Sequence, residues 1–160
     1  MDLLQEQLLG AWRIHESKTS SLIDAVKQAG LQCTLSTRGG RTVGQQLVHV
    51  HAVRISMLEN MRKDLLEGVP KLGRAQGHDK KLLRKGLRAS GKAVEKLIRT
   101  TPDGKVKLFK GGLVTFVAYL IAHESHHRGG IVLTLKQCKH PLSKDDYWKL
   151  WGWSKVPPAR

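Results

Sequence analysis

The segment His123-Glu124-Ser125-His126-His127 holds the densest group of chemically reactive side chains in the sequence. His123 and His127 are four residues apart, so on a helix both imidazoles project from one face, about one turn apart. Neutral imidazole is a good ligand for zinc, nickel, copper or iron. The pair therefore predicts a metal site, with His126 as a reserve ligand. A purely structural role for these histidines stays open.

A third ligand is expected from His49 or His51, which lie on a second apolar-periodic segment. These two side chains differ by about 200° around a helix, so only one of them can face a given site. In helix bundles, metal sites are built from side chains on facing helices. Three histidines would leave coordination positions open, as a catalytic metal requires.

The same five residues also match the HExxH pattern of zinc proteases, in which Glu124 would be the general base. That class needs a further ligand downstream and normally a sheet beside the motif helix. The only later acids are Asp145 and Asp146, and no strand pattern precedes the motif. The sequence therefore disfavours a protease of this class.

The elements that must position these residues are helical. Apolar residues recur every three or four positions, and Gly30, Thr42 and Asp79 stand where helix stops and N-caps belong. The pattern predicts long helices over 2–29, 43–68, 79–99 and 112–138, and a short one over 145–151. This indicates an all-α four-helix bundle with a short C-terminal helix. Residues 105–110 alternate and could form a short extended piece.

Length and composition favour one globular domain over residues 1–160. The longest apolar run, Leu113–Ala122, is half the length of a membrane span, so we expect no membrane association. The acidic N-terminus lacks the basic start of a secretory signal. Cys33 and Cys138 cannot make a disulfide scaffold. These features predict a cytoplasmic protein with two free thiols.

The formal charge is +15, and residues 61–110 carry 15 Lys or Arg against 5 Asp or Glu. Basic residues follow helical spacing opposite the apolar face of the third helix: Lys81, Lys85, Arg88, Lys92 and Arg99. Such a stripe is either a solvated face or a surface for a polyanion. Because no aromatic residue interleaves with it to stack bases, we do not expect a nucleic-acid partner.

Three segments resemble the DinB/YfiT-like metalloenzymes. Gly39–His49 is similar to the entry into their second helix, and His123–Ile131 is similar to their fourth-helix motif, commonly HxxxHRGQ. Tyr147–Trp153 resembles their tryptophan-bearing end. We expect Trp148, Trp151 and Trp153 to pack against one end of the bundle.

The resemblance implies an up-down-down-up bundle with a long crossover, and a divalent metal, most simply zinc or nickel, held by His49, His123 and His127. His49 is preferred to His51 because it follows the family's Leu-x-His pattern. Gly130 departs from the pattern, since glutamine is common there. This departure affects an expected substrate contact and removes no ligand.

The expected function is that of a metal-dependent enzyme, a thiol-cofactor S-transferase or a hydrolase, acting on a small-molecule substrate. The implied cofactors are the metal and a low-molecular-weight thiol, and the implied assembly is a homodimer. Glu124 is a candidate proton shuttle, although on a helix it points about 100° away from His123. Two alternatives are a basic helical module that binds nucleic acid or another polyanion, and a homodimer whose metal only adds stability.

Overall fold

The computed structural model describes residues 2–36 and 38–155, and within them it confirms an all-α fold. The four long helices are α1 (Leu3–Ala25), α2 (Val43–Met61), α3 (Lys80–Arg99) and α4 (Gly112–Gln137), followed by the short α5 (Lys144–Lys149). Three 3-10 turns, η1 (Gln28–Gln32), η2 (Lys63–Leu66) and η3 (Arg74–His78), lie in the connections. Residues 105–110 form turns with one isolated bridge between Val106 and Phe109, so the extended piece considered there is not a strand.

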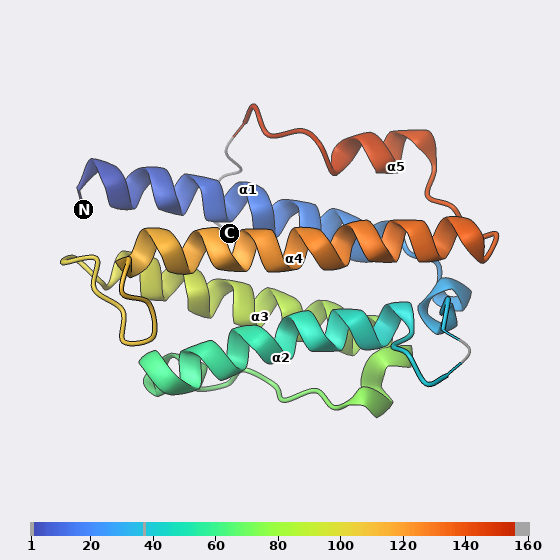
Figure 1. Cartoon of the computed structure of the whole chain (residues 1–160), viewed down its shortest axis with the longest axis horizontal. Coiled ribbons are helices and arrows are strands. Elements are labelled where there is room, and N and C mark those ends of the chain that lie inside the picture. Colours follow the sequence, from blue (N-terminus) through green and yellow to red (C-terminus); the bar gives the residue numbers. More distant parts are fainter. Residues whose placement is uncertain (1, 37, 156–160) are drawn as a thin grey trace.

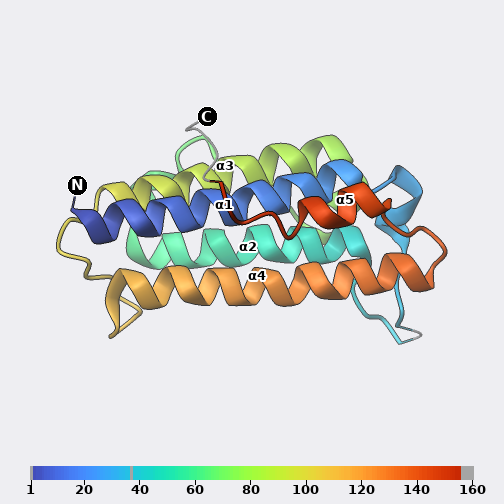
Figure 2. The same cartoon turned by 90° about the horizontal axis from the view of Figure 1, so that it is seen from above.

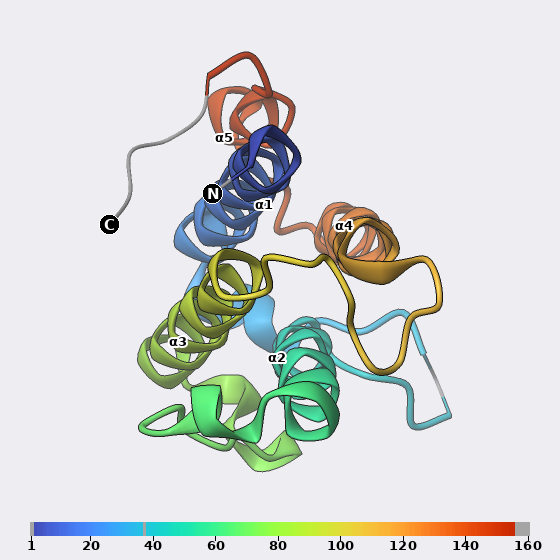
Figure 3. The same ribbon diagram turned by 90° about the vertical axis from the view of Figure 1, so that its left-hand side faces the viewer.

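The helices run up, down, down and up, as the resemblance implied (Figure 1). Residues 62–79, which include η2 and η3, cross back along the bundle and let α3 run in the same direction as α2. Viewed from its end, the bundle has α1 and α2 at opposite corners, and each packs against both α3 and α4 (Figure 3). Because α2 and α4 are antiparallel neighbours, their facing side chains can meet.

Polar side chains begin three of the long helices. The side chains of Asp2, Thr42 and Asp79 each accept a hydrogen bond from the amide three residues later. This satisfies one of the amide groups that a helix start leaves unpaired. At Thr42 the Gln45 side chain also accepts from the Thr42 amide, which completes a capping box and fixes where α2 begins. The predicted N-caps Thr42 and Asp79 are therefore confirmed.

The first helix ends earlier than its apolar pattern predicted. It stops at Ala25 and not near Gly30, because the backbone of Val26 is extended, with φ −64° and ψ 120°. The Lys80 ammonium donates to the carbonyl oxygens of Asp24 at 2.9 Å and Val26 at 2.6 Å at this end. A cation at a helix C-terminus also interacts favourably with the helix dipole. Gly30 instead lies in η1, where a Cβ would come within 2.8 Å of the Leu135 side chain. Close packing therefore explains this glycine.

Two other helices also have shorter or shifted bounds. The second helix ends at Met61 and not at Gly68, because Arg62 leaves helical geometry with φ −152° and ψ 68°. The short helix covers Lys144–Lys149, one turn capped by Ser143, in place of 145–151. No described helix is long and apolar enough to cross a membrane.

The bundle core consists of two apolar clusters with a polar layer between them. One cluster surrounds Leu22, Leu47, Leu83 and Ile131, and the other surrounds Trp12, Leu58, Val94 and Phe116. Between them along the four helices lie buried polar side chains, namely His15, His51, Arg54, Ser90 and Glu124. Burying polar groups is costly unless they bond to one another, and these side chains do so, although Nδ1 of His15 has no partner among the described residues.

The C-terminal tryptophans do not pack as expected. Trp148, Trp151 and Trp153 are 59%, 63% and 38% exposed. The reason is that α5 lies along the outer side of α1, away from the bundle axis, as the view from above shows (Figure 2).

A close backbone contact joins the start of α2 to the crossover. A Cβ added at Gly44 would overlap the Gly77 carbonyl oxygen, whereas a Cβ added at Gly129 would meet nothing within 4 Å. Gly44 is therefore required for packing, while Gly129 is a glycine in an open, exposed part of α4.

These two glycines predict opposite stability changes. Gly44→Ala should lower the free energy of unfolding by about 1–3 kcal/mol, because the added methyl overpacks a backbone contact. Gly129→Ala, the matched control, should raise it by about 0.5–1 kcal/mol. Urea denaturation followed by circular dichroism measures both values. If both substitutions changed the free energy of unfolding equally, the close contact between Gly44 and Gly77 would be wrong.

Candidate metal centre

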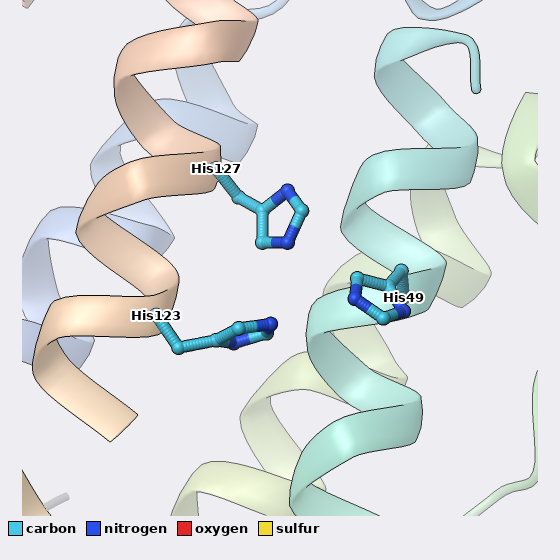
Figure 4. Close-up of side chains that lie close together, drawn as sticks. All are labelled: His49, His123 and His127. Carbon is cyan, nitrogen blue, oxygen red and sulfur yellow. The ribbon is translucent and has the colours of Figure 1, made fainter. Parts of the chain in front are cut away.

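The three predicted ligands come together between α2 and α4. His49 projects from α2 toward His123 and His127 on α4 (Figure 4). One potential ligand atom from each of the three lies within 4.8 Å of the other two. The ring centroid of His49 is 5.3 Å from that of His123 and 4.9 Å from that of His127, and the two α4 rings are 4.7 Å apart. The antiparallel packing of α2 and α4 thus builds a three-histidine cluster.

The environment keeps these imidazoles neutral at neutral pH. All three side chains are partly buried, and this burial is the main reason that their pKa values are lowered. The pKa of His127 falls to about 4 because the charges of His123 and His49 add to the effect of burial. The Arg41 cation also lowers all three pKa values, while Glu124 opposes the shift only at His123. Neutral imidazole is the form that ligates a metal.

The cluster fits a divalent metal ion. The buried Nδ1 of His123 has no hydrogen-bond partner within the described part of the chain. No described group therefore competes with an ion for this nitrogen, and a buried nitrogen without any partner is costly. Two nitrogen ligands of one zinc ion are at most about 4 Å apart, so small side-chain rotations would close the cluster around an ion. Three imidazoles suit zinc, nickel, copper or iron by their chemistry alone.

The neighbouring histidines do not join the cluster. His51 is 1% exposed, and its ring contacts the Ser90 hydroxyl at 3.0 Å and the Pro70 carbonyl oxygen at 2.7 Å. It lies in the polar layer on another face of α2, as the 200° difference from His49 requires. His126 is exposed, and its ring centroid is 5.4 Å from that of His127.

Tyr119 lies beside the histidine cluster, which we did not predict from the sequence. Its ring stacks on His123 with centroids 5.9 Å apart and an interplanar angle of 17°, and it is 39% exposed. Its spacing could have predicted this position, because Tyr119, His123 and His127 repeat every four residues and so share one face of α4.

Gln46 lies across from Gly130, and its side-chain oxygen would be 3.4 Å from a Cβ there. A glutamine from α2 therefore stands beside the position where the family motif commonly has one.

Glu124 lies away from the metal ligands, inside the polar layer. It is 2% exposed, and Arg54 donates to its two oxygens at 2.6 Å each. The Nε2 of His15 lies 2.8 Å from Oε2 of the same carboxylate. Burial opposes ionisation, but the charge and hydrogen bonds of Arg54 outweigh it and lower the pKa of Glu124 to about 2. A carboxylate engaged in this way is not placed to shuttle protons at the histidine cluster.

Arg54 connects all four helices of the bundle. Besides Glu124 on α4, it donates to the Leu87 carbonyl oxygen of α3 at 2.9 Å and pairs with Glu16 of α1 at 2.8 Å. Its guanidinium carbon also lies 5.0 Å from the centre of the Trp12 ring, a cation–π contact. Burial raises the pKa of Glu16 to about 7, although Arg54 opposes the shift.

The fold and the site together place the protein among helical bundles with a candidate metal site. The bundle has up-down-down-up topology, and its second and fourth helices carry the three histidines. The family model that matches is the DinB family, over residues 1–154, and the chain belongs to that family. The resemblance found in the sequence is thereby confirmed. Comparisons with curated proteins and with solved structures gave no match.

The contacts of the polar layer predict that Glu124→Gln lowers the free energy of unfolding strongly and in a pH-dependent way. The variant leaves Arg54 without its main partner, so it should lose about 3–5 kcal/mol of unfolding free energy near pH 6. Glu124 has a folded pKa of about 2, below its ordinary value of 4.5, so its stabilisation is present above pH 4.5 and is lost as the pH falls toward 2.

The difference between wild type and Glu124→Gln should therefore shrink as the pH falls below about 4.5. Denaturant titrations from pH 7 to 3 measure it. Glu95→Gln, which breaks the partly exposed pairs with Arg13 and Arg99, is the control and should cost at most about 1 kcal/mol. A loss at Glu124 no larger than that at Glu95 would show that the buried pair contributes little.

Proposed function

We propose that this DinB-family protein is a metal-dependent enzyme of the thiol-cofactor transferase or hydrolase type. The observation that carries the proposal is the cluster of His49, His123 and His127, whose ligand atoms come within 4.8 Å of one another. Zinc or nickel is the proposed ion, and a low-molecular-weight thiol the proposed co-substrate. When bound, a divalent ion would act as a Lewis acid and lower the pKa of a coordinated water or thiol.

The side chains around the cluster support an anionic or thiolate ligand at the open positions. Three neutral imidazoles leave the charge of an ion uncompensated, and Arg41 adds a further positive charge. Tyr119 offers an aromatic ring and a hydroxyl beside His123. In this proposal, the histidines hold the ion, Arg41 attracts the negatively charged reactant and Tyr119 lines its path.

Glu124 is assigned a different role from the proton shuttle expected at first. Its carboxylate binds Arg54 and His15 within the bundle. Because Glu124 follows His123 directly, this bond holds α4 so that the neighbouring imidazole faces α2. We propose that Glu124 is a positioning residue.

The basic face of α3 is proposed to be a solvated face. Its Lys and Arg side chains are exposed, namely Lys81, Lys85, Arg88, Lys92 and Arg99. None of them belongs to the histidine cluster, so the charge acts on the site only at long range. A nucleic-acid partner is not part of the proposal, and the homodimer stays a prediction.

Metal analysis tests the proposal directly. Protein purified without a histidine tag should hold close to one divalent ion per chain, and His123→Ala and His127→Ala should each lose most of it. His126→Ala is the matched control, because its imidazole is exposed beside the cluster. Elemental analysis by mass spectrometry gives the stoichiometry. If wild type binds no ion, or if His126→Ala loses as much as His123→Ala, the metal centre is wrong.

An activity screen tests the reaction type. Thiol cofactors combined with electrophiles, and separately hydrolysable esters and amides, should reveal turnover that His127→Ala abolishes. If the basic face steers anionic reactants, kcat/KM should fall as salt rises, and replacing Lys81, Lys85 and Arg88 by glutamine should flatten that slope. A salt-independent kcat/KM in the wild type would show that the face does not contribute.

A further inference from the structure

An open cavity lies between the C-terminal half of α4 and the segment that contains α5. Its volume is about 820 Å³, within the range of small-molecule sites. Val132 and Leu133 of α4 form one wall, and Leu142, Tyr147 and Trp151 form the other. In the end-on view, α4 and α5 both flank α1, and α5 lies on the side of α1 away from α2 (Figure 3). We call this cavity the α4–α5 groove.

The α4–α5 groove is separate from the histidine cluster. Val132 comes nine residues after His123, which places it about 180° around the helix axis. The histidines face α2, so the groove opens on the opposite side of α4. A ligand in the groove would not reach the metal ligands.

Two cations lie at one part of the α4–α5 groove, one in its lining and one beside it. Arg128 lines the groove, and its Nη1 is buried with no hydrogen-bond partner among residues 2–36 and 38–155, although Nη2 donates to the Ser125 hydroxyl at 2.8 Å. Lys18 of α1 is 9% exposed. Its ammonium would be 3.5 Å from a Cβ at Gly152, between the groove-lining residues Trp151 and Trp153.

The two cations lie close enough to affect each other. Burial lowers the pKa of the Lys18 ammonium, and the nearby Arg128 charge lowers it further. Within the described part of the chain no acidic side chain lines the groove, whereas Lys136 and Lys144 do. Buried charges are normally paired, so this site lacks an anion.

We propose that the α4–α5 groove binds an amphipathic anion, a carboxylate with a fatty or aromatic body. The carboxylate pairs with Nη1 of Arg128, which has no partner among the described residues, and with the Lys18 ammonium near Gly152. The apolar body lies along Val132, Leu133 and Trp151. This occupant explains both features of the groove, because it covers an exposed aromatic wall and neutralises two cations.

Isothermal titration calorimetry with dodecanoate, at concentrations below micelle formation, tests the proposal. We expect one dodecanoate per chain and no comparable binding of dodecyltrimethylammonium, which has the same tail and the opposite charge. Arg128→Gln should weaken dodecanoate binding about tenfold or more, because a hydrogen-bonded charge pair is lost. Gly129→Leu should block the groove, and Gly129→Ala is its matched control.

Further variants keep the result interpretable. Lys136→Glu changes an exposed side chain, so it tests the same charge effect if Arg128→Gln fails to fold. His123→Ala should leave dodecanoate binding unchanged, which separates this site from the proposed metal centre. Lys81→Gln on α3 controls for overall charge. Binding that tolerates Arg128→Gln and Gly129→Leu, or equal binding of the cationic detergent, would overturn the proposal.

Sedimentation analysis tests the competing occupant, a second copy of the chain. A dimer that Gly129→Leu dissociates and that dodecanoate does not affect would assign the groove to self-association and overturn the ligand proposal. A sedimentation coefficient that is the same with and without Gly129→Leu supports the small anion.

Discussion

The buried pair of Arg54 and Glu124 is the interaction on which the arrangement of this bundle depends. It joins α2 to α4, and the other contacts of Arg54 bring in α3 and α1. Two charges in a core are tolerated only when their donors and acceptors are satisfied, so the four helices must meet at one level. Since His49 lies five residues before Arg54 and His123 directly precedes Glu124, the same contact sets the height at which the imidazoles face one another.

The polar layer also restricts how the helices can pair. The apolar clusters on either side of it are similar in chemistry, and leucine-rich faces alone would tolerate a shift of one helix by a turn. A one-turn shift would move Arg54 or Glu124 into an apolar cluster without a partner, at a cost of several kcal/mol. The layer thus exchanges some hydrophobic burial for a single register, and the histidine cluster depends on that register.

Much of this could be predicted from the sequence, because helix periodicity, the caps at Thr42 and Asp79 and the spacing of His123 and His127 are local properties. The end of α1 could not be predicted, since its carbonyl groups bond to Lys80, a residue more than fifty positions away. Periodicity showed that His49 and His51 face different ways but not which one faces α4, and the family motif made that choice. The partners of Glu124 were hidden for the same reason, because Arg54 and His15 lie on other helices.

Helix α4 has two working faces, with the imidazoles on one and the α4–α5 groove on the other. It runs without interruption for 26 residues, and its backbone hydrogen bonds make it turn as one rod. Any rotation of this rod that widened the groove would swing His123 and His127 through the same angle relative to His49. A change in the width of the α4–α5 groove would therefore be coupled to a change in the geometry of the histidine cluster, through rotation of α4.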